Sequence, residues 1–211
     1  GAIGLALADI LAGDPGYAIT TFKASDVEGA NGGEAFSVRL VRFYVTGKIT
    51  PDFDYKFQAQ LNGTPHMRDY YLEWVKYPQF RVKVGQFKRP FTYENPYNPL
   101  DLGLGDYSLG VRSLAAIAAD RCGAATAGGR DQGVQIQGDL LPLGEDGHRL
   151  LHYQIGVFNG NGINAADNNA DKDLIGTLQL QPFKGLSVGA FGWLGNWKSG
   201  DVTVERNRWS V

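Results

Sequence analysis

Long hydrophobic runs are absent from this chain of 211 residues. A helix that crosses a membrane needs about 18 or more consecutive apolar residues, so no such helix is expected. Without helices, a chain can cross a bilayer only as a closed β-barrel, whose strands satisfy one another's backbone hydrogen bonds. Charge of one sign is not in excess either, because the formal net charge is -2. Nucleic acid is therefore not an expected partner.

Residues that usually catalyse reactions or hold metals are scarce. The single cysteine, Cys122, excludes an intramolecular disulfide, and no organised histidine partner makes it a nucleophile. The three histidines lack the spacing of metal ligands. Acids alternate from Asp167 to Asp173 as in a calcium loop, but Lys172 stands where the turn glycine belongs, so a polar loop is expected and calcium stays an open alternative. With no nucleophile, base and orienting group together, we expect no enzyme and no cofactor.

What the sequence does contain is alternation of apolar and polar residues. From Phe53 to Leu61, odd-numbered residues are apolar or aromatic and even-numbered residues are polar or charged. Because successive side chains of a strand point to opposite faces, this pattern predicts a strand with one apolar face. Breakers such as Pro51 and Asp52 separate such segments, so the chain is predicted to be all-β with roughly nine or ten strands. The predicted strands cover residues 17–23, 36–49, 53–62, 68–76, 80–88, 133–140, 150–158, 173–181, 186–193 and 202–211.

Two architectures explain such alternation. A soluble β-sandwich, for instance a carbohydrate-binding module that stacks sugars on exposed Trp and Tyr, turns its apolar face inward. A transmembrane antiparallel up-and-down β-barrel turns its apolar face to lipid and its polar face to a wet lumen. The apolar face here includes amphipathic rings, Tyr70 and Trp74, of the kind found in interfacial girdles, which favours the barrel. A barrel with a structural or adhesive role remains a further alternative.

The barrel interpretation predicts a direction for individual side chains. We expect the lumen to receive the polar face of each strand, and lipid to receive the apolar face. The side chains expected to point outward are Phe53, Tyr55, Phe57, Leu61, Leu72 and Trp74. Those expected to point inward are Lys56, Gln58, Asp69 and Glu73.

Residues 89–131 form a long segment, rich in Pro, Gly and Ala, between two predicted strands. Connections of this length are usually functional or disordered. We expect the segment to leave the wall and fold into the lumen, with Arg112 near the narrowest point. Residues 1–16 are small and apolar like the core of a signal peptide, but lack its basic start, so their role is left open.

Two stretches of the chain, Met67 to Trp74 and Val82 to Glu94, resemble the core of the phosphate-selective porin O/P family. The resemblance covers most of the chain from about Phe36 onward. Shorter similarities lie at Arg39–Lys48, Asp52–Leu61, Arg112–Leu114, Arg130–Val134 and Tyr153–Gly160. The resemblance implies a barrel of about sixteen strands in the bacterial outer membrane. It also implies a trimer, an inward-folded third loop and a basic lumen that attracts anions.

These implications define the expected function and site. We expect a porin for passive diffusion of small solutes, with a mild preference for anions such as phosphate, in contact with outer-membrane lipid and with two further copies of the chain. Lumen acids such as Asp54, Asp69 and Glu73 are expected to cancel part of the basic field. The candidate solute-binding residues are Arg42, Lys48, Lys56, Arg81, Lys83 and Arg112.

The sequence departs from the family pattern in two ways. Phosphate-specific members carry two adjacent arginines where this chain has Arg39 and Leu40, so weaker phosphate discrimination is expected. The strand count is below that of the family, and Val211 ends an unfinished alternating strand. Residues 1–211 are therefore expected to be an incomplete single barrel domain, the N-terminal part of a longer chain.

Overall fold

The computed structural model describes residues 2–3, 16–23, 35–98, 101–102, 106–121, 125–143 and 147–211. Eleven strands in this part of the chain form one antiparallel sheet, and two more form a separate hairpin. The main sheet contains β1 (Ala2–Ile3), β2 (Gly16–Lys23), β3 (Ala35–Thr50), β4 (Phe53–Gln60), β5 (His66–Tyr77), β6 (Phe80–Lys88), β7 (Arg130–Leu143), β8 (His148–Phe158), β9 (Asp173–Phe183), β10 (Leu186–Leu194) and β13 (Arg208–Ser210). The hairpin consists of β11 (Asn196–Ser199) and β12 (Val202–Glu205), and α1 spans Leu109–Leu114.

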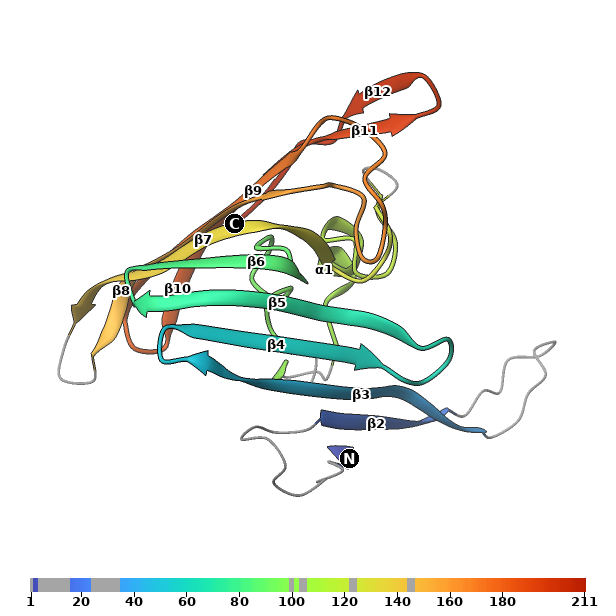
Figure 1. The fold of residues 1–211 in the computed structure, drawn as a ribbon, viewed down its shortest axis with the longest axis horizontal. Helices are drawn as coiled ribbons and strands as arrows, with labels where there is room; N and C mark the ends of the chain where they lie inside the picture. Colours follow the sequence, from blue (N-terminus) through green and yellow to red (C-terminus); the bar gives the residue numbers. More distant parts are fainter. Residues whose placement is uncertain are drawn as a thin grey trace.

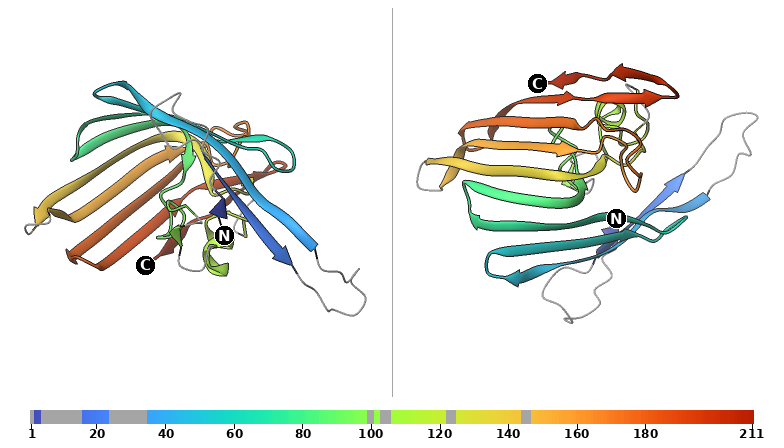
Figure 2. Two further views of the ribbon diagram at one scale, coloured as in Figure 1. Left: turned by 90° about the horizontal axis from the view of Figure 1, so that it is seen from below. Right: turned by 45° about the horizontal axis from the view of Figure 1, so that its top comes forward.

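The sheet is a single curved layer in which successive strands pair with their neighbours in sequence up to β10 (Figure 1). It is open, with β1 and β13 at its two edges. Figure 2 shows it curving to one side, with α1 and the segment after β6 on the concave side. In the described part of the chain, no helix has the length and apolar character needed to span a membrane. The predicted all-β, up-and-down meander is confirmed.

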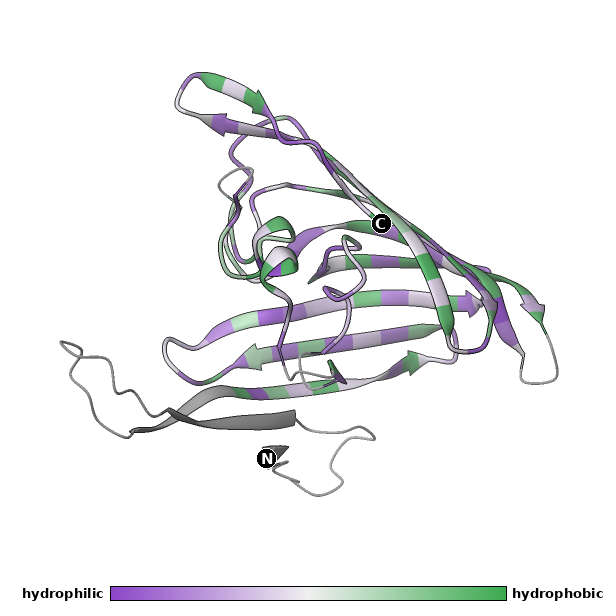
Figure 3. Ribbon diagram, turned by 180° about the vertical axis from the view of Figure 1, so that it is seen from behind, coloured by the Kyte–Doolittle hydropathy of each residue, from purple (hydrophilic) through white to green (hydrophobic). Residues whose placement is uncertain are grey.

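Hydrophobic and hydrophilic residues alternate along the coloured strands in Figure 3, so the two faces of the sheet differ in polarity. Phe57 pairs with Tyr70 across β4 and β5, and its side chain is 48% exposed on the convex face. Gln58, one residue later, is buried on the concave face, as are Asp69 and Glu73. The predicted inward and outward directions are therefore confirmed for these strands. A β-sandwich would instead bury Phe57 between two sheets.

Exposed large apolar residues continue along the convex face from β3 to β10. A soluble monomer rarely exposes an apolar surface this extensive, whereas lipid solvates one without cost. They include Phe43, Phe53, Phe57, Leu72, Val84, Val134, Ile155, Val157, Leu174, Leu178, Val188 and Leu194.

The predicted strand at residues 202–211 is wrong. β12 pairs with β11 in a separate hairpin, and β13 pairs with β10 instead. The interruption has a physical cause: Arg206 turns inward to meet Asp173, and Asn207 accepts a hydrogen bond from the Gly195 N–H. The alternating pattern gave no sign of these contacts because they depend on residues distant in sequence.

The segment between β6 and β7 leaves the wall and packs on the concave face. Its Phe91 and Ala115 are fully buried. Phe91 meets Trp193 of β10 edge to face, with ring centroids 5.5 Å apart. The buried apolar core formed in this way comprises Phe87, Phe91, Ala115, Phe158, Ile175, Phe191 and Trp193. The segment between β6 and β7 therefore covers part of the concave face and packs against it through apolar side chains.

Some sequence expectations concern residues outside the described ranges. Cys122 is one of them, and so is most of the segment 1–16. The described part of segment 89–131 leaves out residues 99–100, 103–105 and 122–124.

Candidate functional site

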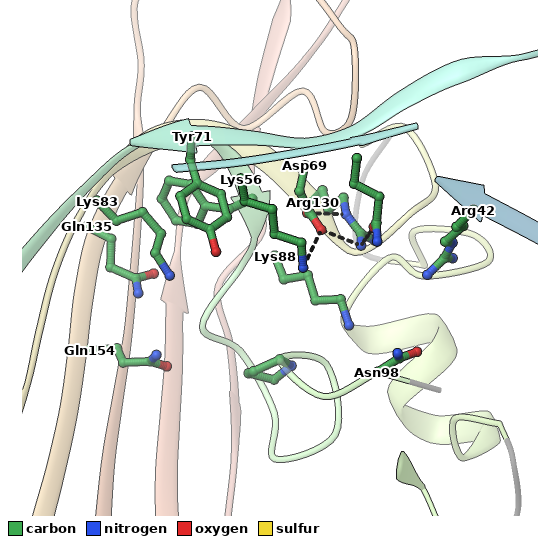
Figure 4. Close-up of a pocket in the computed structure, with 13 residues that line it drawn as sticks. Arg42, Lys56, Asp69, Tyr71, Lys83, Lys88, Asn98, Arg130, Gln135 and Gln154 are labelled. Carbon is green, nitrogen blue, oxygen red and sulfur yellow. Dashed lines mark hydrogen bonds and ion pairs between the residues drawn. The ribbon is translucent and has the colours of Figure 1, made fainter. Parts of the chain in front are cut away.

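A cavity of about 220 Å³ lies on the concave face, between the strands β3 to β8 and the segment that follows β6 (Figure 4). We call it the cationic pocket. Pro96 and Asn98 of that segment close one side, so wall and loop both contribute to it. Its lining consists of Arg42, Lys56, Gln58, Asp69, Tyr71, Lys83, Phe87, Lys88, Pro96, Asn98, Arg130, Gln135 and Gln154.

Cations dominate the lining, with five basic side chains and one carboxylate. The carboxylate, Asp69, is shared between two of the cations. Arg130 donates two hydrogen bonds to it, one from Nε to Oδ1 over 2.6 Å and one from Nη2 to Oδ2 over 3.2 Å. Lys56 lies 3.7 Å from the same carboxylate. One acid cannot neutralise this many bases, so the pocket carries excess positive charge.

Two other pocket lysines have partners that do not include the pocket carboxylate Asp69. Lys83 lies 3.2 Å from Glu73, which is not part of the lining, and its ammonium sits 4.6 Å from the centre of the Tyr71 ring. An aromatic face attracts a cation through its quadrupole and leaves the full charge in place. Lys88 donates to the backbone oxygen of Tyr97 and, over 3.1 Å, to the hydroxyl of Tyr107. Neutral partners thus position Lys88 and tie the loop to the pocket.

The structure gathers only half of the predicted site residues in this pocket. Arg42, Lys56 and Lys83 line it. The other three, Lys48, Arg81 and Arg112, lie elsewhere and are described below.

Each remaining candidate has an acidic partner of its own. Lys48 is largely exposed and lies 2.5 Å from Asp54. Arg81 lies 2.8 Å from Asp139, which also meets His152. Arg112, on α1, is 3.4 Å from Asp106 and does not line the pocket.

Sequence reasoning missed two pocket cations, Lys88 and Arg130. They are the last residue of β6 and the first of β7, and they pair across those strands. Both occur in the stretches whose family resemblance was noted. Their position at the two ends of the long segment was the available signal, because the base of an inward loop has to lie on the concave face.

A second group of charged residues surrounds Trp193, and we call it the Trp193 cluster. Its members are Arg89, Arg206, Arg208, Asp120, Asp131, Asp173 and Trp193. Arg206 lies 2.6 Å from Asp173, which also accepts a hydrogen bond of 2.7 Å from the Trp193 indole N–H. Arg208 lies 2.9 Å from Asp120 and stacks on Trp193, 3.9 Å from the ring centre. The cluster thereby joins β9, β10 and β13 to the loop residue Asp120.

The Trp193 cluster also fixes the base of the loop. Arg89 donates to the backbone oxygen of Ala115 over 2.8 Å and lies 3.6 Å from Asp131. Burial lowers the pKa of the Arg89 guanidinium to about 10, and Asp131 opposes that shift, so the group stays charged at neutral pH. The Asn95 amide closes the neck of the loop by donating to the backbone oxygens of Arg89 and Gly129, over 2.8 and 2.9 Å.

Comparison with known proteins agrees with this geometry. No curated protein matches the chain. The family model of phosphate-selective porin O and P matches residues 14–184, which is most of the chain. The matched span includes every strand of the wall from β2 to β9 and the whole inward segment. The chain therefore belongs to the phosphate-selective porin O and P family, whose members are bacterial outer-membrane porins.

Proposed function

We propose that this porin allows small solutes to diffuse passively and prefers anions, with phosphate among them. The observation that carries the proposal is the cationic pocket, with five bases against one carboxylate on the concave face. The chain as a whole has a formal net charge of -2, so the positive charge is concentrated where a solute would pass. Low-dielectric walls focus such a field and raise the local concentration of anions.

The pocket supports fast passage and argues against tight capture. Arg130 has the planar fork that binds a phosphate with two hydrogen bonds, but Asp69 already occupies that fork. Contacts with a passing anion then fall to Arg42 and to Lys56, Lys83 and Lys88, whose ammonium groups act as point charges. Several weak sites let an ion enter and leave quickly, as a channel requires.

The remaining candidate residues have a supporting role in this proposal. We place Lys48, Arg81 and Arg112 along the approach to the pocket, where their fields are reduced by the acids beside them. The inward segment narrows the path, because Pro96 and Asn98 form one side of the pocket. Residues 1–211 belong to one barrel domain, which contacts outer-membrane lipid through its convex face and assembles as a homotrimer.

Reversal potentials in a salt gradient across planar bilayers test the proposal. We expect the channel to be anion-selective and Lys56→Gln to reduce that selectivity. Lys48→Gln is the matched control, because it removes the same charge from an exposed pair outside the pocket. Cation selectivity of the unaltered channel, or an equal effect of the two variants, would contradict the proposal.

A further inference from the structure

The cationic pocket contains one buried acceptor that no protein group satisfies. Gln135 of β7 is 2% exposed, and its Oε1 atom has no hydrogen-bond partner in the part of the chain that the structure describes. A buried acceptor without a partner costs free energy, so each one in a native structure calls for an explanation. The remaining polar groups of the lining are chiefly donors, which makes an acceptor at this point unusual.

A chain of amide hydrogen bonds fixes which end of Gln135 faces the pocket. Glu73 accepts from the Gln137 Nε2, and an ionised carboxylate can only accept. The Oε1 of Gln137 must therefore point the other way, where it accepts from Gln135 Nε2 over 2.7 Å. Since the Gln135 nitrogen is committed to this bond, its free end is an oxygen. The assignment follows from Glu73 and does not depend on how the amide itself was oriented.

The same chain of bonds orients a second pocket amide. Gln154 of β8 donates a hydrogen bond from its Nε2 to the Gln137 Oε1 over 2.9 Å. The Oε1 of Gln154 is therefore the end of this amide that remains for the pocket. Figure 4 shows Gln135 and Gln154 on one side of the pocket and Arg42 on the other. Lys83 pairs with Gln135 across β6 and β7 and lies beside it in Figure 4. This side of the pocket thus combines amide oxygens, which suit a hydroxyl donor, with a cation, which suits anionic oxygens.

We infer that Gln135 is a specificity-determining residue that accepts a hydrogen bond from the hydroxyl of an oxyanion. The inference rests on the proposed anion preference and adds that the preferred anion carries a hydroxyl group. Hydrogen phosphate carries a P–OH donor together with anionic oxygens, whereas sulfate has the same shape and charge but no hydroxyl. Sulfate leaves the Gln135 acceptor buried and unpaired, so it binds less well. A site built to pair with a hydroxyl discriminates by this mechanism against an analogue that lacks one.

The test is the block of chloride current by phosphate and by sulfate, measured on single channels at about pH 8, where both anions are mainly dianions. We expect phosphate to block about tenfold better than sulfate. Gln135→Met removes the acceptor at similar size, and should reduce this ratio to near one. Gln179→Met is the matched control: it alters an amide on β9 that does not line the pocket, and should keep the ratio.

Glu73→Gln provides a second variant that leaves Gln135 in place. A neutral amide can donate as well as accept, so the chain of amides is free to reverse and Gln135 can present its Nε2 to the pocket. We expect sulfate to block more strongly relative to phosphate, so that the ratio of phosphate block to sulfate block falls. The ratio is the readout, because loss of the Lys83 partner acts on both dianions alike.

The outcomes separate the inference from the proposed function. If neither anion blocks the unaltered channel, the proposed anion preference fails. If both block it equally, or if the ratio survives in Gln135→Met, only the role of Gln135 is overturned. If Gln135→Met does not fold, an unchanged ratio of phosphate to sulfate block in Glu73→Gln also overturns the role of Gln135.

Discussion

The cationic pocket and the Trp193 cluster are both built from charged side chains on the concave face, yet they differ in charge balance. The Trp193 cluster has three guanidinium groups and three carboxylates, and each guanidinium meets a carboxylate. The lining of the pocket has five cations and one carboxylate, and a second carboxylate, Glu73, lies beside Lys83. A buried charge without an opposite partner is costly, so balance is what allows burial. The excess positive charge of the pocket therefore requires solvation by water or, in the proposed function, neutralisation by an anion.

Exposure separates the two regions only in part. In the Trp193 cluster the side chains of Arg206 and Asp173 are each 2% exposed. In the pocket the paired side chains of Arg130 and Asp69 are equally buried, at 2% and 5%, whereas those of Lys56 and Lys83 are 28% and 15% exposed. The balanced group holds chain segments together, and in the proposed function the unbalanced one interacts with solutes. The inward segment joins them, because it carries Asp120 to the cluster and Asn98 to the pocket.

Asp173→Asn should show the largest effect, because it breaks the balance of the Trp193 cluster. The substitution keeps the shape of the side chain but removes the nearer of the two carboxylates beside the buried Arg206, which leaves Asp120 at 3.8 Å. Removing one partner of a buried pair costs about 3–5 kcal/mol. We expect the free energy of unfolding in detergent micelles, measured with urea, to fall by this amount. Anion selectivity of the folded fraction should change little.

Asp54→Asn is the matched control for that experiment. Asp54 pairs with Lys48, whose side chain is 60% exposed, and such pairs contribute about 0–1 kcal/mol. Similar losses in the two variants would mean that the Trp193 cluster does not anchor the fold.

Asp69→Asn applies the same chemical change to the pocket and should have an intermediate effect. Arg130 loses a charged acceptor, and hydrogen bonds to charged groups contribute about 1.5–3 kcal/mol. The cost stays below that of Asp173→Asn because water reaches this site, where the side chain of Lys56 beside Asp69 is 28% exposed, and water can solvate the uncovered charge. At the same time the pocket becomes more positive, so we expect stronger and longer block by phosphate. A loss of stability without any change in block would remove the functional distinction between the two regions.

The wall of the barrel could be predicted from the sequence because its signal is local. Alternation from Phe53 to Leu61 depends only on which face of the sheet each side chain occupies, and the structure confirms it. Prediction failed at residues 202–211, where side chains bind distant partners. Arg206 reaches Asp173, which lies 33 positions away in the sequence. Periodicity contains no information about such contacts.

The pocket could be predicted only in part, for a related reason. Alternation identified Lys56 and Lys83 as concave-face cations, but it predicted Lys48 to be a solute-binding residue on the same grounds. What separates Lys48 from the other two is an exposed acidic partner and distance from the loop, and both depend on the folded arrangement. The missed cation Arg130 owes its place to Asp69, 61 positions earlier in the sequence.

Thr177→Val should have the smallest effect, and it tests whether placement of the loop matters apart from charge. The Thr177 hydroxyl of β9 donates to the buried backbone oxygen of Pro90 over 2.6 Å, at the start of the inward segment. Valine has nearly the same shape, so the change removes one hydrogen bond, worth about 1 kcal/mol of stability. No charge changes in either region, so the reversal potential should stay constant. The loosened segment should instead increase current noise, and Thr177→Ser, which keeps the hydroxyl, should not. A shifted reversal potential in Thr177→Val would mean that the position of the loop sets selectivity as strongly as the pocket charges do.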